Sequence, residues 1–212
     1  MGNHFVELFD QWANSYDQTV MGDDLEYRDV FLHYDDILQH VADKAFGHVL
    51  EFGPGTGNLT VKLINKGLTV IGVEPSGVMR KIALEKVAGR AEIIEGHFFH
   101  FPKDVTVQTI ASSYAFHHLT DGEKREAIAS YRNILPSGGK IVFADTMYET
   151  VKTYQKAIKD ATQKGFHDLA HDLQSEYYTT IPVLTDIFNQ NGFDVEFEQC
   201  NDFVWIMEGI KR

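Results

Sequence analysis

A run of glycines follows an apolar segment near residue 50 and offers the clearest chemistry in the sequence. It reads Glu51-Phe52-Gly53-Pro54-Gly55-Thr56-Gly57 and lies between a predicted buried strand (48–52) and a predicted helix (58–66). Glycines in such a place let the main chain turn tightly and approach a ligand closely. Ligands of open α/β sheets bind at the carboxyl ends of the strands, where this loop lies. The pattern therefore predicts a binding loop.

The spacing within the loop argues against two common nucleotide sites. The dinucleotide fingerprint G-x-G-x-x-G, read from Gly53, needs a glycine at the position of Asn58. A phosphate-binding P-loop needs a Lys followed by Ser or Thr, and no such pair follows. The carboxylate of Glu51 is a poor neighbour for a pyrophosphate and suits a cationic ligand better. An NAD-dependent oxidoreductase is therefore a disfavoured alternative.

A second carboxylate, Glu74, ends the next predicted strand (68–73), 17 residues after Gly57. A carboxylate at this place can accept hydrogen bonds from both hydroxyls of a ribose. The loop, Glu51 and Glu74 together predict a nucleoside ligand that is positively charged or not phosphorylated. The structural alternative is a tight turn beside a solvated glutamate.

Strands and helices alternate from residue 47 onwards, which predicts an α/β fold with a mostly parallel sheet covered on both faces. The last two strands alternate apolar and polar residues, as a terminal antiparallel pair would. The predicted strands are 48–52, 68–73, 91–95, 105–113, 140–145, 194–199 and 203–209, and the main helices between them are 58–66, 76–87, 121–135 and 181–191.

Two further helical regions flank this core. Apolar residues at spacings of three and four predict a first helix, and Asp23-Asp24 offers caps for a second that continues to about Phe46. Residues 149–175 also look helical, and their aromatic side chains form either a lid or a small core of their own. We expect a single domain with a helical front (1–46), a cofactor-binding core (47–148), a helical insert (149–180) and a last helix with a strand pair (181–212). The first-helix residues are Phe5, Leu8, Phe9, Trp12 and Tyr16.

At these motifs the sequence resembles the class I S-adenosylmethionine-dependent methyltransferases. The resemblance implies a Rossmann-like three-layer sandwich, with a seven-stranded sheet and an antiparallel C-terminal strand. Over its whole length the chain is similar to the small bacterial YrrT-type methyltransferases, from which no substrate carries over. The matching motifs are the first motif (49–58), the ribose-binding acid (73–76), the fourth-strand motif (112–119), the turn before strand five (135–141) and Asn191-Gly192-Phe193.

The matching positions share one implied task, which is to hold the cofactor S-adenosyl-L-methionine. Met79 could instead be ordinary core packing. The implied roles are Glu51 and the backbone of Gly53, Gly55 and Gly57 for the methionine end, Glu74 for the ribose, Met79 for the adenine, and Ser113 beside the sulfonium.

One position departs from the family pattern, in which Gly-Asp follows the third strand and the Asp accepts a hydrogen bond from the adenine amino group. Here Gly96-His97 stands in its place. A neutral imidazole nitrogen can accept that bond in only one tautomer. We therefore expect cofactor affinity to weaken below about pH 6, where an unperturbed His becomes charged.

On the acceptor side, methyl transfer needs alignment and exclusion of water more than it needs a base. If a base is used, His117 is the first candidate, although a histidine at a helix start can simply pack against the loop. Tyr16 of the front helix would close over the cofactor. Further candidates at the same rim are Tyr27, His118, Asp145 and Tyr148.

No metal site is predicted, because each pair of nearby histidines lacks a further ligand. The lone Cys200 is expected to be a small buried hydrophobe. The histidine pairs considered are His167 with His171, His97 with His100, and His117 with His118.

The overall charge narrows the choice of partner. The chain has 212 residues, with 19 Lys and Arg against 31 Asp and Glu, a net charge of −12. This balance disfavours nucleic acid, whose binding depends on basic side chains. No leader pattern and no apolar run of about 20 residues is present. We expect a cytoplasmic enzyme with a small-molecule acceptor and no membrane partner, or alternatively a non-catalytic binder of the cofactor.

Overall fold

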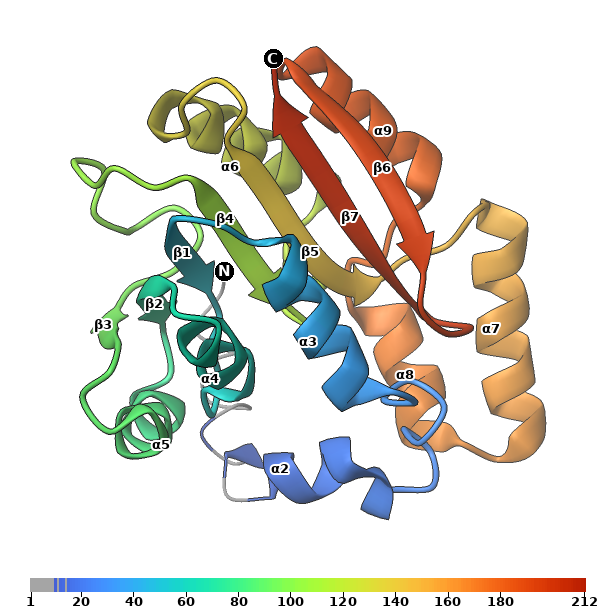
Figure 1. Ribbon diagram of the computed structural model, residues 1–212. Coiled ribbons are helices and arrows are strands. Elements are labelled where there is room, and N and C mark those ends of the chain that lie inside the picture. Colours follow the sequence, from blue (N-terminus) through green and yellow to red (C-terminus); the bar gives the residue numbers. More distant parts are fainter. Residues whose placement is uncertain (1–9, 11, 14) are drawn as a thin grey trace.

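The computed structural model describes residues 10, 12, 13 and 15–212. Within them a seven-stranded sheet forms the middle layer, in the order β3-β2-β1-β4-β5-β7-β6 (Figure 1). Strand β7 runs antiparallel to both neighbours, and the other pairs are parallel. The predicted Rossmann-like fold is confirmed. The strands are β1 (His48–Phe52), β2 (Thr69–Glu74), β3 (Glu92–Glu95), β4 (Thr109–Ser113), β5 (Lys140–Thr146), β6 (Phe193–Gln199) and β7 (Val204–Lys211).

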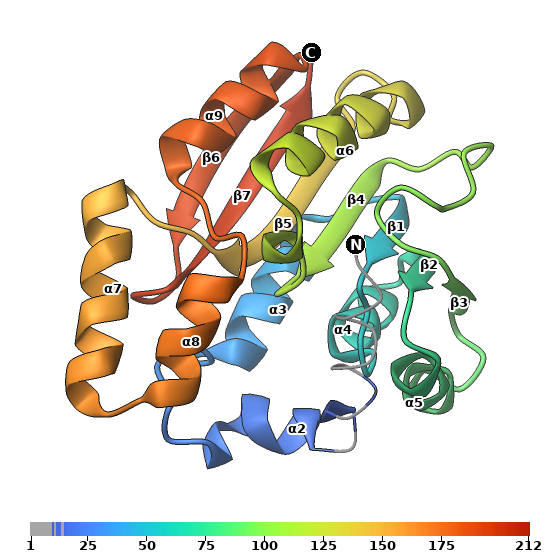
Figure 2. The ribbon, with the colours of Figure 1, turned by 180° about the vertical axis from the view of Figure 1, so that it is seen from behind.

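Helices cover both faces of the sheet, as Figures 1 and 2 show from opposite sides. Successive residues of a strand point to opposite faces. Val49 packs into the apolar cluster of α3 and α4, whereas Leu50 packs into the cluster of α6 and α9. Burial on both faces explains why the central strands read as apolar runs. One face carries α3 (Tyr34–Lys44), α4 (Asn58–Asn65) and α5 (Gly77–Val87), and the other carries α6 (Asp121–Ile134) and α9 (Ile181–Gln190).

Side-chain caps fix where two of these helices begin. Thr120 and Glu123 form a capping box at the start of α6, in which each side chain accepts a hydrogen bond from the other residue's backbone N–H. The Ser76 hydroxyl accepts from the Met79 N–H at 3.1 Å and starts α5. These caps satisfy backbone donors that have no partner inside the helix, and they are why the predicted helix starts are correct.

The second front helix was predicted to begin after Asp23-Asp24, and this is wrong. Asp24 instead accepts a hydrogen bond from the Glu26 N–H at 2.9 Å and closes a turn. Residues 25–33 form turns, held by Asn201, whose amide donates to the Val30 and Leu32 carbonyls. The helix begins only at Tyr34 because tertiary contacts override the local capping signal. In the first front helix, Phe5, Leu8 and Phe9 lie outside the described residues.

Two other predicted elements have different bounds. The fourth strand was predicted from 105 but begins at Thr109, because its neighbours β1 and β5 start opposite that point. The insert was predicted as one mostly helical stretch and is instead a pair, α7 (Val151–Lys164) and α8 (His167–Ser175). Gly165, with φ of 76°, lies between them and lets the chain turn back.

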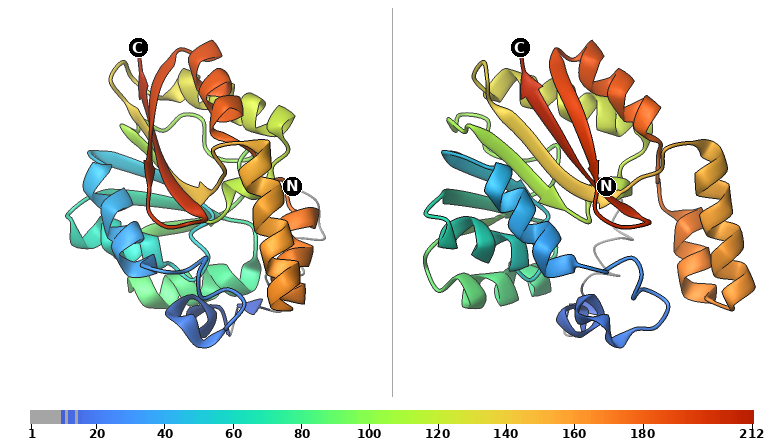
Figure 3. Two further views of the ribbon diagram at one scale, coloured as in Figure 1. Left: turned by 90° about the vertical axis from the view of Figure 1, so that its right-hand side faces the viewer. Right: turned by 45° about the vertical axis from the view of Figure 1, so that its right-hand side comes forward.

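Two segments lie at the carboxyl ends of the parallel strands: α2 (Tyr16–Gln18) with the π-helical turn η1 (Thr19–Asp23), and the α7–α8 pair (Figures 1 and 3). Tyr27 and Val30 of the front share an apolar cluster with Leu169 and Leu173 of α8. The insert's aromatic side chains thus pack into a core shared with the front. None of the described helices is both long enough and apolar enough to cross a membrane.

Candidate functional site

A pocket lies at the carboxyl ends of β1, β2 and β4, beneath α2 and η1 (residues 16–23), which we call the front segment. It encloses about 650 Å³, counting its open mouth. Eight of the residues predicted from the sequence line it, whereas Glu51, Gly57, His117, Tyr27, Asp145 and Tyr148 do not. The lining is Tyr16, Tyr34, Gly53, Pro54, Gly55, Leu59, Val73, Glu74, Pro75, Met79, His97, Phe98, Ser113, Tyr114, Ala115 and His118.

The glycine loop requires glycine for two physical reasons. Gly53, Gly55 and Gly57 take φ values of 64°, 56° and 89°, a region that other residues rarely adopt. A Cβ on Gly53 would lie 2.9 Å from the Cβ of Ala115, across the pocket floor. Gly53 and Gly55 present their backbone to the pocket, while Gly57 caps the start of α4.

Glu51 is buried under the loop, on the side of the sheet that faces α4. One of its carboxylate oxygens accepts a hydrogen bond from the Thr60 hydroxyl at 2.7 Å. The other, Oε1, is buried and has no hydrogen-bond partner among the described residues. Burial raises the pKa of Glu51 to about 8. A buried carboxyl oxygen without a partner is costly, so the site is set up for a donor or a cation.

Glu74 lines the pocket at the end of β2 and braces the loop. Its Oε2 accepts from the Gly55 N–H at 2.8 Å, and its Oε1 accepts from the Ser76 N–H at 2.9 Å. Burial raises the pKa of Glu74 to about 7, although these two backbone hydrogen bonds act in the opposite direction. The conformation of the loop therefore depends on hydrogen bonds to the Glu74 carboxylate, which are strongest when that carboxylate is charged.

Three further predicted residues lie on the pocket wall. Met79 is buried in the first turn of α5, and Ser113 ends β4. His97 Nδ1 accepts a hydrogen bond from the Phe99 N–H at 3.3 Å. Because this nitrogen accepts, the neutral ring carries its hydrogen on Nε2 and offers a donor. Burial lowers the pKa of His97.

The front segment is held over the pocket by a polar network centred on Asp17. This carboxylate accepts from Thr56 Oγ1 at 2.6 Å and from Asn58 Nδ2 at 3.0 Å, and it pairs with Lys86 at 2.8 Å. Burial alone would raise the pKa of Asp17, but these contacts outweigh it and lower that pKa. Tyr16, next in the chain, lines the pocket; that it closes over the cofactor stays a prediction.

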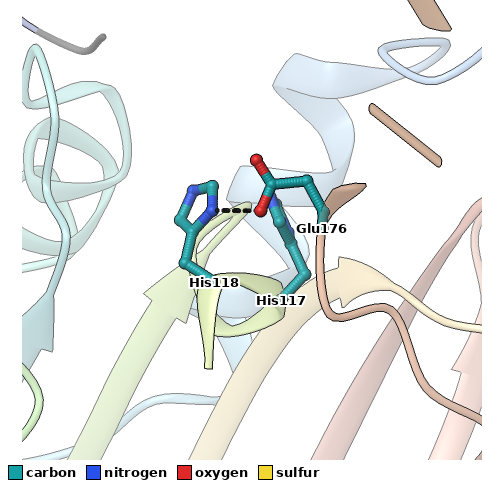
Figure 4. A group of neighbouring side chains, drawn as sticks. All are labelled: His117, His118 and Glu176. Atoms are coloured by element: carbon teal, nitrogen blue, oxygen red, sulfur yellow. Dashed lines mark hydrogen bonds and ion pairs between the residues drawn. The ribbon is translucent and has the colours of Figure 1, made fainter. Parts of the chain in front are cut away.

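The two adjacent histidines of η2 (Phe116–His118) face different partners. His117 Nδ1 lies 2.5 Å from Asp145 Oδ1, and its ring stacks on Tyr178 away from the main pocket. His118 lines the pocket, and its Nδ1 lies 3.0 Å from Glu176 Oε2 (Figure 4). Glu176 follows α8 and is 58 residues from His118, so no local pattern could have revealed this pair.

The remaining acceptor-side candidates lie farther from the pocket. Tyr27 is hydrogen-bonded to Asp172 of α8. The Tyr148 hydroxyl is buried without a hydrogen-bond partner among the described residues, and its ring stacks on Tyr154. The sequence analysis did not single out Tyr34, a pocket residue at the start of α3.

Comparisons with known proteins agree on one family. Residues 49–139 match the family described as methyltransferase domain. The chain is 55% identical, over the full length of both, to an "uncharacterized methyltransferase" of Bacillus thuringiensis (strain Al Hakam). A second relative with that description, from Geobacillus kaustophilus (strain HTA426), is 56% identical and covers all of this chain and 99% of its own. The chain belongs to the methyltransferases.

Solved structures support the same fold for this methyltransferase. Magnesium protoporphyrin IX methyltransferase from Synechocystis PCC 6803, with bound SAH, superposes with a TM-score of 0.75 and covers 99% of each chain at 14% identity. The DhpI–SAH complex gives a TM-score of 0.69 at 17% identity, covering 97% of this chain and 95% of its own. At these identities the likeness concerns the fold. The narrower YrrT-type resemblance stays a prediction.

The methyltransferase also brings together side chains that the sequence left unconnected. The side-chain nitrogen and oxygen atoms of His117, His118 and Glu176 that could bind a metal ion lie within 4.8 Å of one another. The sequence offered only the histidine pair, which lacks a third ligand; the fold supplies Glu176. Asp145, also predicted at this rim, lies against the far side of His117.

Proposed function

We propose that this methyltransferase transfers a methyl group from S-adenosyl-L-methionine to a small-molecule acceptor by in-line displacement. The observation that carries the proposal is the pair of buried carboxyl groups, Glu51 and Glu74, beside a glycine loop. Neither carboxylate forms an ion pair with a described residue, although the nearby Arg80 charge acts to lower the pKa of Glu74. Such a site favours a cationic nucleoside over a phosphorylated one. The SAH bound in the two structural neighbours supports the same cofactor.

The residues present fit this cofactor along the length of the pocket. Glu51 does not line the pocket itself but lies under the loop whose Gly53 and Gly55 do, and its Oε1, which is buried without a partner among the described residues, would accept from the methionine ammonium there. Glu74 would accept from the ribose hydroxyls, and Met79 would pack against the adenine ring. With its Nε2–H, His97 would donate to a ring nitrogen of adenine instead of accepting from the amino group.

S-adenosyl-L-methionine supplies a methyl group on a sulfonium, which leaves as a neutral thioether. The protein's part is to align the reactants and keep water out. Ser113 would border the sulfonium at the end of β4. Tyr16 would cover the pocket, held there by the hydrogen bonds of Asp17 to the loop.

A small acceptor is supported by the enclosure of the site and by its charge. The front segment and the α7–α8 pair lie at the carboxyl ends of the strands (Figure 3), and the pocket there is lined by Tyr16 of the front, the glycine loop and the strand ends. The chain carries a net charge of −12, which works against a nucleic-acid substrate. The non-catalytic alternative shares the pocket but predicts no methylated product, and an NAD-dependent oxidoreductase is disfavoured by Asn58 and Glu51.

Binding and turnover are tested with S-adenosylhomocysteine calorimetry and a panel of small acceptors. We expect cofactor binding by the wild-type protein and formation of S-adenosylhomocysteine with an acceptor. Glu74→Ala should weaken binding by about 1–3 kcal/mol, because it removes a charged acceptor from the ribose and two braces from the loop. Glu126→Gln, on the exposed face of α6, is the control. Tighter binding of NAD than of the cofactor would contradict the proposal.

A further inference from the structure

One side of the pocket, which we call the histidine side, is formed by His118 with its neighbours His117, Asp145 and Glu176. These side chains form an acid–base arrangement to which no role in holding the cofactor has been given above. His118 lines the same pocket as Ser113, the residue that would border the sulfonium. Its ring is 6% exposed, and that of His117 does not reach the pocket. Of the two histidines in η2, His118 is therefore the one within reach of an acceptor.

The hydrogen bond to Glu176 selects the form of the His118 ring. A carboxylate only accepts hydrogen bonds, so the contact of 3.0 Å places a hydrogen on His118 Nδ1. In the neutral ring the basic lone pair is then on Nε2. A histidine held by a carboxylate in this way is oriented as a base, and the carboxylate stabilises the imidazolium that forms.

The surrounding charges separate the two histidines. Among the described residues, the titratable groups that face His118 are His117 of η2, Asp145 of β5 and Glu176 after α8. Burial and the neighbouring His117 lower the pKa of His118, so it is neutral at neutral pH. Burial also acts against the charge of His117, but contact with Asp145 outweighs it and raises the pKa of His117. Neighbouring groups whose pKa values are pushed apart are typical of acid–base assignments.

The same charges argue against a metal ion between these side chains. The carboxylates of Asp145 and Glu176 are balanced by charged His117 and by the Lys124 ammonium, whose Nζ donates to the carbonyls of Leu119 and Tyr177. A divalent ion would add charge that nothing here neutralises.

We propose that His118 is the general base for the acceptor, that Glu176 is its positioning residue, and that the acceptor atom therefore carries a proton, as a hydroxyl, thiol or amine does. The proposal rests on the proposed function. A lone pair of the acceptor atom forms the new bond to the methyl carbon, and the carbon–sulfur bond breaks with its electrons left on sulfur. The acceptor's proton moves to Nε2 of His118, and the Nδ1–H stays on Glu176. An acceptor without a proton would gain nothing from this arrangement.

Two phenols test the proposal kinetically. At pH 8 phenol keeps its proton, whereas 4-nitrophenol is mostly ionised and needs no base. With S-adenosyl-L-methionine, His118→Gln should slow transfer to phenol by about 10²–10⁴-fold and transfer to 4-nitrophenol far less. Glu176→Gln should act in the same direction and move the acidic limb of the phenol pH profile to lower pH. His171→Gln and Glu126→Gln, on exposed surfaces of α8 and α6, are the controls. Equal losses with both phenols, or no loss, would overturn the role of His118.

Nuclear magnetic resonance of the ¹⁵N-histidine-labelled protein gives a readout that needs no turnover. We expect His118 to be neutral at pH 7 with its hydrogen on Nδ1, and Glu176→Gln to change both its tautomer population and its titration. A charged His118 at pH 7, or a hydrogen on Nε2, would contradict the proposal. S-adenosylhomocysteine binding by the wild-type protein, measured separately, tests the proposed function, so the two failures are distinguishable.

Discussion

Two pairs of largely buried carboxyl groups flank the pocket, and their surroundings shift them in opposite directions. On the loop side, burial raises the pKa of Glu51 to about 8 and that of Glu74 to about 7. On the histidine side burial acts in the same sense, but His117 lowers the pKa of Asp145, and His118 lowers that of Glu176. The difference is that each carboxylate on the histidine side contacts a histidine ring, whereas on the loop side only the nearby Arg80 charge acts to lower the pKa of Glu74, and burial outweighs it.

The contrast shows that the carboxylates of the histidine side have their partners within the protein, whereas Glu51 on the loop side does not have one among the described residues. Asp145 pairs with the charged His117, and Glu176 accepts a hydrogen bond from His118, so both carboxylates are favoured in their charged forms. Glu51 lacks any such partner among the described residues, so its charged form is unfavourable until a ligand provides one. The fold thus carries an energetic cost at the loop that cofactor binding relieves.

The largest expected effect on stability comes from removing the carboxylate of the buried pair formed by His117 and Asp145. Asp145→Asn should reduce the free energy of unfolding by about 3–5 kcal/mol, because it leaves His117 without its counter-charge. The raised pKa of His117 contributes stability that is present below about pH 6.5 and is lost as the pH rises through its higher folded value. Urea unfolding should therefore show a larger loss at pH 6 than at pH 9; equal losses would show that the pair is not charged.

The loop side should behave in the opposite way. Glu51→Gln should weaken S-adenosylhomocysteine binding by about 1.5–3 kcal/mol, because a charged hydrogen bond is lost. It should also flatten the pH dependence of unfolding. With its folded pKa raised to about 8, Glu51 makes the wild type less stable as the pH rises from its unfolded value toward 8. Calorimetry and unfolding at pH 5 and pH 8 measure both; an unchanged slope would mean that Glu51 is charged in the free protein.

The smallest expected effect concerns His97. Its protonation at low pH would break the hydrogen bond from Phe99 to Nδ1, which is worth about 0.5–1.5 kcal/mol. Because the pKa of His97 is lowered, the fall in cofactor affinity should begin below the usual range for histidine. Titrations of wild type and His97→Asp should differ in this range. Superimposable curves would remove His97 from the adenine end of the pocket.

The two sides also differ in how far the sequence predicts them. Glu51, the glycines and Glu74 belong to strand ends and the turns that follow, so their spacing along the chain places them together. Six of the seven strands begin within two residues of the predicted position, because alternating apolar runs and glycine breaks are local signals. The residues of the loop side could be predicted from the sequence for this reason.

The histidine side depends on contacts between distant segments. Glu176 reaches His118 only because α8 folds back across the strand ends, and the return is made at Gly165. The sequence singled out His117, whereas the fold turns His118 to the pocket. Similarly, Asp24 has the residue type of a helix cap but closes a turn, since Asn201 holds the following residues. The contact of His118 with Glu176 and the turn at Asp24 are both determined by tertiary packing, which the spacing of residues along the chain does not predict.

The proton balance of cofactor binding tests the contrast most directly. At pH 6.5 Glu51 should be protonated in the free protein and ionised beside the methionine ammonium, so binding must release its proton. Calorimetry of S-adenosylhomocysteine in buffers with different heats of ionisation should show net proton release that falls by close to one proton in Glu51→Gln, with any remainder assigned to Glu74, whose pKa of about 7 also lies above this pH. Binding without proton release, or with uptake, would contradict the account.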